Sequence, residues 1–157
     1  MNENYLAIIS LSERVHRQVL ELMKLELDRL DIHDINNVQA MMLFNIGDAK
    51  LAVGELTLRG CYLGTNASYN LKKMVENRYL ELERSVHDRR SVYVQLTTKG
   101  HQLHSKLAEM HDKHIEMLQQ SGIGDSDLAG IVATLRRLER FWMNASDRAS
   151  RARQFAA

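Results

Sequence analysis

The sequence contains no proline and only eight glycines among its 157 residues. Proline is the residue that most often breaks a helix, so its absence permits long uninterrupted helices. Proline-rich stretches also form many linkers, and no other segment of this chain suggests a boundary. We therefore expect a single domain that spans residues 1–157.

Cysteine is nearly absent, and the one present, Cys61, excludes a disulfide within the chain. No apolar run approaches the ~20 residues that a membrane-spanning helix needs. The first residues lack the basic start and apolar core of a secretory signal, so we expect a cytoplasmic protein without a membrane segment. The sequence also lacks a serine elbow, a phosphate-binding loop and a close carboxylate pair, which argues against an enzyme.

The net charge of +1 hides an uneven distribution. Residues 59–99 contain eight basic and four acidic side chains, whereas the rest of the chain contains thirteen basic and sixteen acidic ones. A basic centre in an acidic frame indicates a local site for an anion. The alternative is that an excess of four positive charges arose by chance.

Apolar residues recur at intervals of three and four from residue 4 to residue 30, which predicts one amphipathic helix. The apolar face is wide, which favours burial against a partner subunit. Asn36 is suited to cap a second helix that ends near Gly47. Further helices are predicted at 53–59, at 65–77 with Asn77 as a left-handed end, at about 98–120 after a cap at Thr97 or Thr98, and from 125 or 126 onward.

The predicted helix at 65–77 has two contrasting faces. Its apolar face can hold the helix on the domain and consists of Ala67, Leu71, Met74 and Val75. Its polar face consists of Thr65, Asn66, Ser68, Tyr69, Asn70, Lys72 and Lys73. Short amide and hydroxyl groups suit base edges, and lysines suit phosphates. A short helix and a glycine-bounded turn precede it, which is the order of a helix-turn-helix.

Residues 79–84 and 92–96 alternate between apolar and polar side chains, which predicts two antiparallel strands. The tip between them carries Asp88, Arg89 and Arg90. A basic ribbon of this kind can bind a polyanion or can be an ordinary solvated hairpin. Its position directly after a helix-turn-helix favours a DNA-binding wing.

These features together resemble the MarR family of bacterial transcription regulators. The residues that carry the resemblance are 35–39, 51–56, 65–79, the D-x-R tip at 88–90 and the L-T-x-x-G exit at 96–100. The resemblance covers almost the whole chain, and the tip and exit at this spacing are its most specific part. It implies a mostly α fold with a winged helix-turn-helix lobe at residues 36–98 and a two-stranded β-wing. It also implies long N- and C-terminal helices, at 1–34 and 99–157, that join a homodimer.

The resemblance implies roles for the predicted DNA-binding residues. The helix at 65–77 would lie in the major groove of double-stranded DNA. At the wing tip, Arg90 would enter the minor groove, Asp88 would orient it and Arg89 would contact a phosphate.

Two departures put the family's target sequence and the wing's approach angle in doubt. No arginine lies between Thr65 and Asn77, and Asn77-Arg78-Tyr79 replaces the usual glycine. Within the family, residues 59–81 are similar to the alphaproteobacterial LdtR-like regulators.

Met41, Met42 and Phe44 on the second helix are most simply core residues. Flexible methionines also suit an adaptable pocket for a small-molecule effector, and the family places such a pocket where the first, second and fifth helices meet. In that interpretation His16 and Arg17 would be its polar anchors.

Four histidines, at positions 101, 104, 111 and 114, lie on the helix predicted at 98–120. His104 and His111 are ~10 Å apart along the helix axis, too far to share an ion, so we expect a polar or dimer-facing stripe and no metal site. Cys61 is most simply a buried turn residue, and a reactive thiol is the alternative.

We therefore expect a sequence-specific DNA-binding regulator with no cofactor. By analogy with the family, it would be a repressor that binds an inverted-repeat operator as a homodimer and is released by a small-molecule effector. The alternatives are a metal- or thiol-responsive regulator and a winged-helix module that binds another protein.

Overall fold

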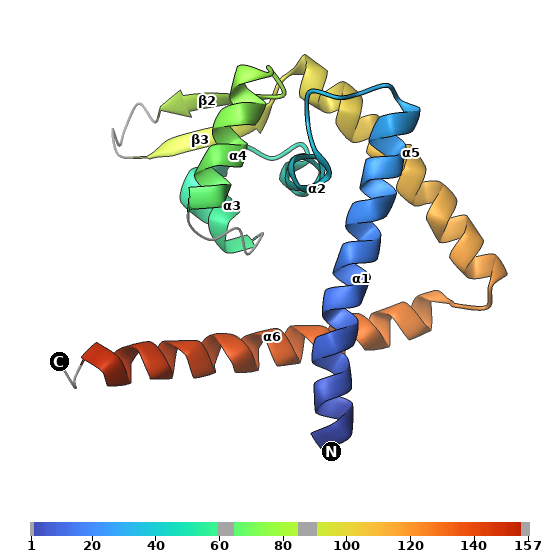
Figure 1. Ribbon diagram of the computed structural model, residues 1–157, viewed down its shortest axis with the longest axis vertical. Coiled ribbons are helices and arrows are strands. Elements are labelled where there is room, and N and C mark those ends of the chain that lie inside the picture. The colour runs from blue at the N-terminus through green and yellow to red at the C-terminus, as the bar shows by residue number, and fades with distance from the viewer. Residues whose placement is uncertain (1, 60–64, 85–90, 155–157) are drawn as a thin grey trace. The chain divides into compact units, whose positions relative to one another are not determined.

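The computed structural model describes residues 2–59, 65–84 and 91–154, without the side chains of residues 57–59, 65 and 150–154. The elements follow the order α1 (Asn2–Arg29), α2 (Asn37–Ile46), β1 (Leu51–Ala52), α3 (Val53–Arg59), α4 (Thr65–Glu76), β2 (Leu80–Arg84), β3 (Val92–Leu96), α5 (Thr98–Gln120) and α6 (Asp125–Gln154) (Figure 1). The chain packs as two units, Met1–His111 and Asp112–Ala157. The expectation of a single domain stays a prediction.

The long first helix is confirmed, and only its C-terminal part is buried in the first unit. Met23 and Leu27 lie in the core, and the buried carboxylate of Glu26 accepts two hydrogen bonds from Arg29 at 2.6 and 2.8 Å. The side chain of Asn37 donates to the carbonyl oxygen of Leu20 at 3.1 Å, which joins α2 to α1. No helix within the described ranges is long and apolar enough to cross a bilayer.

Asn36 is confirmed as the N-cap of α2. Its side-chain oxygen accepts the backbone N–H of Gln39 at 2.9 Å. In return, Oε1 of Gln39 accepts the backbone N–H of Asn36 at 3.0 Å. These reciprocal bonds form a capping box, which satisfies two backbone donors at the start of the helix.

The predicted ribbon of β2 and β3 is confirmed, but it belongs to a three-stranded antiparallel sheet in the order β1-β3-β2. The register runs from the pair Leu80–Leu96 to the pair Arg84–Val92. On the other edge of β3, Leu51 pairs with Val94 and both are buried. The two-residue strand β1 therefore closes the inner edge of the wing.

The left-handed residue after α4 is Arg78, with φ of 61°, so the expectation for Asn77 was wrong by one position. The backbone N–H of Tyr79 donates to the carbonyl oxygen of Met74 at 2.9 Å. This bond closes the end of the helix, and Arg78 is the residue that takes the left-handed conformation there. The side chain of Asn77 donates instead to the carbonyl oxygen of Asp34. A left-handed arginine costs about 1–2 kcal/mol, so the surrounding contacts must hold it.

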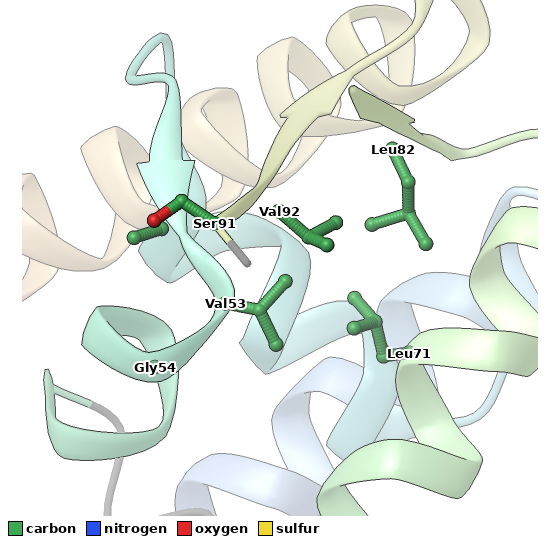
Figure 2. Close-up of a pocket in the computed structure, with 7 residues that line it drawn as sticks. Val53, Gly54, Leu71, Leu82, Ser91 and Val92 are labelled. Carbon is green, nitrogen blue, oxygen red and sulfur yellow. The ribbon is translucent and has the colours of Figure 1, made fainter. Parts of the chain in front are cut away.

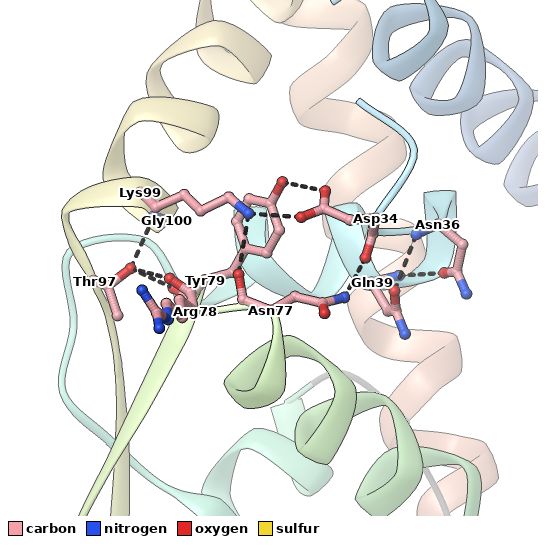
Figure 3. A network of polar contacts seen from close by, with 9 residues as sticks. All are labelled: Asp34, Asn36, Gln39, Asn77, Arg78, Tyr79, Thr97, Lys99 and Gly100. Carbon is pink, nitrogen blue, oxygen red and sulfur yellow. Dashed lines mark hydrogen bonds and ion pairs between the residues drawn. The ribbon is translucent and has the colours of Figure 1, made fainter. Parts of the chain in front are cut away.

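Those contacts come from the Asp34 cluster, which we define as Asp34, Asn77, Tyr79 and Lys99 (Figure 3). The carboxylate of Asp34 accepts from the phenol of Tyr79 at 2.7 Å and from Nζ of Lys99 at 2.6 Å. Lys99 also donates to the carbonyl oxygen of Asn77 at 3.1 Å and lies 4.0 Å from the centre of the Tyr79 ring. The cluster joins the loop before α2, the start of β2 and the first turn of α5.

Two opposing effects act on the carboxyl group of Asp34. Partial burial raises its pKa, but the hydrogen bonds from Lys99 and Tyr79 outweigh that effect and leave the pKa below its ordinary value. Burial, followed by the hydrogen bond to Asp34, raises the pKa of Tyr79 above its ordinary value. The phenol therefore stays a neutral donor, and the carboxylate stays charged near neutral pH.

The L-T-x-x-G exit has a structural cause. Of the two predicted caps, Thr97 is the one used, because its hydroxyl accepts the backbone N–H of Gly100 at 3.1 Å and donates to the carbonyl oxygen of Arg78 at 2.6 Å. A Cβ atom on Gly100 would lie 2.2 Å from the carbonyl oxygen of Tyr79. Only glycine permits this close approach of α5 to the start of the wing.

Within the second unit, α6 begins at Asp125 as expected. Its first turn is closed by the side chain of Asp127, which accepts the backbone N–H of Gly124 at 2.9 Å. Gly122, with φ of 87°, ends the preceding helix. The large apolar side chains of α6 are mostly exposed, including Leu128, Ile131 and Leu135.

We predict that Asp34→Asn lowers the free energy of unfolding by about 1 kcal/mol at pH 7. The amide loses the charge-assisted bonds from Lys99 and Tyr79, and the half-exposed position limits the loss. Because the folded pKa lies below 3.8, the stabilisation is complete above that pH and disappears as the pH falls through the folded pKa. Urea unfolding at pH 7 and at about pH 3 measures both effects.

Asp28→Asn is the matched control, because this exposed carboxylate on α1 lies outside the Asp34 cluster. Its free energy of unfolding is expected to stay within roughly 0.5 kcal/mol of the wild type. Equal stabilities of Asp34→Asn and the wild type at pH 7 would show that the cluster does not hold the wing.

Candidate nucleic-acid interface

The inner face of α4 is anchored as its pattern predicts. Met74 is fully buried, and Leu71 and Val75 pack against the core. Ala67 is half-buried. α4 contacts both α2 and β2, so its orientation is set by the helix-turn-helix and by the wing together (Figure 1).

The outer face of α4 is polar and open to solvent. Asn66, Ser68 and Lys72 are exposed, and Tyr69 presents 59% of its surface although it is aromatic. Thr65 begins the helix, but its side chain lies outside the described residues, so its place on the polar face stays a prediction. An exposed tyrosine among amides and hydroxyls suits contact with base edges and the sugar-phosphate backbone.

Three of the predicted DNA-binding residues, Asn70, Lys72 and Lys73, have partners within the chain. Oδ1 of Asn70 accepts from Nε2 of Gln39 at 3.2 Å. Nζ of Lys73 donates to Glu76 at 2.8 Å, and the Lys72 ammonium lies 3.8 Å from the same carboxylate. The hydrogen bond and charge of Glu76 raise the pKa of Lys73, and Lys73 in turn lowers the pKa of Glu76.

Glu76 is a residue that the prediction of the site missed. Its carboxylate places a negative charge beside both lysines that were predicted to contact phosphates. The spacings of three and four residues to Lys73 and Lys72 are those of ion pairs on one helix face. The sequence therefore contained the signal that could have found this residue.

Two acidic side chains on β2 have partners within the chain. Nε2 of Gln95 donates to Glu81 at 2.6 Å, and Nζ of Lys50 donates to Glu83 at 2.5 Å. The register places Arg84 opposite Val92 as the last pair before the tip. The predicted tip residues Asp88, Arg89 and Arg90 lie outside the described residues, and their roles stay predictions.

A pocket of about 560 Å³ lies at the junction of α3, α4 and the wing (Figure 2). Its lining is mostly apolar and consists of Ala52, Val53, Gly54, Leu71, Leu82, Ser91 and Val92. Leu82 is 46% exposed at its edge, so the outer half of the predicted apolar face of β2 is uncovered by the described residues.

The residues predicted to bind an effector lie elsewhere in the first unit. His16 and Arg17 are exposed on α1, where Arg17 pairs with Glu13 at 3.9 Å. Met42 is buried in the core, and Met41 and Phe44 pack against it. The core interpretation of the α2 residues is supported, and their role in a pocket stays a prediction.

Three histidines of α5, at positions 101, 104 and 111, lie near α2 and the loop that follows it. The Phe44 ring stacks on His104 at 5.0 Å and lies 4.6 Å from His111, measured between ring centres. Nδ1 of His101 is 3.3 Å from Asp48. Among the described residues, no three His, Cys, Asp or Glu side chains are grouped to hold a metal ion. Cys61 lies outside the described residues.

Comparison with known proteins supports the resemblance to the MarR family. The sequence profile of the MarR family matches residues 33–91. The chain is 37% identical over 142 residues to the exopolysaccharide II synthesis transcriptional activator ExpG of Rhizobium meliloti (strain 1021), covering 90% of this chain and 73% of that protein.

Two solved structures share the fold. FabT of Streptococcus pneumoniae, solved in complex with DNA, superposes with a TM-score of 0.68 at 22% identity, covering 89% of this chain and 98% of the other. MarR of Staphylococcus aureus, solved in complex with salicylate and kanamycin, gives 0.67 at 19% identity, with coverages of 91% and 92%.

These similarities leave the LdtR-like subgroup a prediction. They confirm the predicted family, the winged-helix fold and a DNA-binding regulator, not an enzyme. The chain belongs to the MarR family of transcriptional regulators.

Proposed function

We propose that this protein controls transcription as a homodimer that binds an inverted-repeat operator in the cytoplasm. The observation that carries the proposal is the exposed polar face of α4, held beside the ribbon of β2 and β3. Each protomer would place α4 in a major groove, and two protomers would reach successive grooves ~34 Å apart. Selection of bound fragments from random DNA tests it, because an inverted repeat should be recovered.

The contacts divide along α4. Its first half presents Asn66, Ser68 and Tyr69, whose short or planar polar groups suit base edges. Its second half presents Lys72 and Lys73, which suit phosphates. Thr65 at the start of the helix would join the first group.

The proposed dimer rests on apolar surface that the described chain leaves uncovered. On α1 the exposed side chains include Leu6, Ile9, Val15, Leu22 and Leu25. On α6 they include Leu128, Ile131, Val132, Leu135 and Phe141. Pairs within each set, such as Leu6 and Ile9, Leu22 and Leu25, or Ile131 and Leu135, are three or four residues apart. Large exposed apolar patches usually mark an interface. A second copy of the chain, with the same stripes, is the partner we propose.

The wing would add a minor-groove contact. Arg84 and Val92 form the last described pair of the ribbon, and the predicted tip lies between them in the sequence. We assign Arg90 to the groove, Asp88 to its orientation and Arg89 to a phosphate. A narrow minor groove concentrates negative potential, which suits an inserted arginine.

We further propose a small-molecule effector that shifts the population of DNA-binding conformations. Phe44, Met41 and Met42 are the candidates on α2, with His16 and Arg17 on α1. The Staphylococcus aureus MarR solved with salicylate and kanamycin supports this, since it is a protein of the same fold with bound small molecules. Repression is the outcome we expect from family analogy, with release of the operator on binding of the effector.

Activation is the second candidate, and it is favoured by one observation. The relative at 37% identity is a transcriptional activator. The position of the operator relative to the promoter distinguishes the two, because a repressor site overlaps the polymerase site and an activator site lies upstream of it. Transcription in vitro from a promoter with the selected operator decides between them.

For the dimer, we predict that Ile131→Asp combined with Leu135→Asp yields a monomer with the 18.1 kDa mass of one chain. Two buried carboxylates would oppose closure of an apolar interface. Light scattering after size exclusion measures the mass. Ala133→Asp, on the opposite side of α6, is the matched control and should remain a dimer. If the double variant were still a dimer, α6 would not be part of the interface.

For the wing, we predict that Arg90→Ala weakens operator binding by about 1–3 kcal/mol while the dimer stays intact. The loss should be greatest for operators whose minor groove is narrow, because the inserted guanidinium follows groove width. Gel-shift titration on two operators of different A·T content measures this. Arg89→Ala should weaken both operators equally, and unchanged affinity in Arg90→Ala would contradict the assignment.

For the phosphate contacts, we predict that Glu76→Gln strengthens binding to DNA of any sequence by roughly three- to tenfold and steepens its salt dependence. Without the carboxylate, Lys72 and Lys73 would be occupied by DNA and not by an internal partner. The control is Glu109→Gln, which breaks a similar Lys–Glu pair on α5 and should leave binding unchanged. Weaker binding by Glu76→Gln would place the lysines outside the interface.

A further inference from the structure

The side-chain amide of Gln39 has only one orientation that satisfies its neighbours. A backbone N–H can only donate, so the Gln39 atom that faces the N–H of Asn36 at 3.0 Å must be the oxygen (Figure 3). The NH₂ group of Gln39 must then point the other way. Gln39 is 5% exposed, so the capping box fixes this polarity in a buried position.

The same constraint passes to α4. The NH₂ group of Gln39 lies 3.2 Å from the side chain of Asn70 and can only donate. The Asn70 atom that faces it must therefore be Oδ1, because a second NH₂ group could not accept. The NH₂ group of Asn70 is consequently directed away from α2, on a residue that is half-buried at the edge of the polar face of α4.

We propose that Gln39 is a positioning residue for DNA recognition, which makes Asn70 a donor that contacts an acceptor on a base edge. The inference rests on the proposed function, in which α4 lies in the major groove. Asn70 is in the half of α4 that precedes the lysines, and the N-terminal part of a recognition helix contacts bases.

The orientation restricts which bases Asn70 can recognise. Asparagine usually selects adenine by a pair of bonds, in which its oxygen accepts from N6 and its NH₂ group donates to N7. Here the oxygen is turned toward Gln39, which occupies one of its two lone pairs, so the bidentate contact is disfavoured. The remaining donor suits N7 or O6 of guanine, N7 of adenine or O4 of thymine, and it disfavours the N4 amino group of cytosine.

Gln39→Glu reverses this polarity while it preserves the fold. Glutamate is an ordinary capping-box residue, so one carboxylate oxygen still accepts the N–H of Asn36, and the start of a helix favours its negative charge. The other oxygen can only accept, so Asn70 must turn its NH₂ group toward residue 39. Its oxygen then faces the DNA and selects a base edge that carries a donor.

The experiment is selection from random double-stranded DNA with the full-length wild type and with Gln39→Glu, followed by competition binding with all four base pairs at each position. We expect the two proteins to share an operator except at one base pair in each half-site. There the variant should prefer a donor-bearing edge, and the preference should shift by about tenfold. Circular dichroism and the thermal midpoint check that the variant is folded.

Two controls separate positioning from other effects. Gln102→Glu adds the same charge at an exposed position of α5 and should retain the wild-type preference. In an Asn70→Ala background, Gln39→Glu should no longer change the preference, because the residue that it turns is absent.

An identical operator for wild type and Gln39→Glu, or a uniform loss of affinity for all sequences, would overturn the inference and leave the proposed function intact. Failure of the wild type to enrich any sequence would instead overturn the proposed function, and this inference with it.

Discussion

The rest of the winged helix-turn-helix depends on the hydrogen bonds that the carboxylate of Asp34 accepts. This carboxylate accepts from Tyr79 at the start of β2 and from Lys99 in the first turn of α5. These bonds hold the wing and α5 to the loop before α2, where the helix-turn-helix begins. Arg78 is left-handed, and Gly100 lies close to the carbonyl oxygen of Tyr79. The contacts of the Asp34 cluster hold the backbone on both sides of these positions and so offset the strain.

The chemistry of α4 is set as much by its neighbours as by its own residues. Asn70 and Lys73 are polar side chains on α4, the helix proposed to read DNA, but each has an internal partner, Gln39 and Glu76 respectively. The first partner fixes the direction of an amide, and the second competes for an ammonium. A list of residue types on the exposed face therefore overstates what that face presents to DNA.

Much of the fold could be predicted from the sequence, because its signals are local. The cap at Asn36, the apolar face through Met74 and the cap at Thr97 each depend on residues within a few positions. The pairing of Leu51 with Val94 and the role of Asp34 depend on partners more than forty residues away. No spacing rule reaches that far. The polar face of α4 was predictable from its residue types. The direction of its amides was not, because it follows from a chain of hydrogen bonds that only the folded chain forms.

The strand order β1-β3-β2 has a consequence for how the lobe assembles. The central strand is the last of the three in the chain, so neither β1 nor β2 has a partner until Val92–Leu96 is available. The β2–β3 hairpin closes over a short loop and can form early, whereas β1 must be recruited across a much longer one. During synthesis the helix-turn-helix would be complete before its wing. The pairing of β1 with β3, which joins the two, would form last.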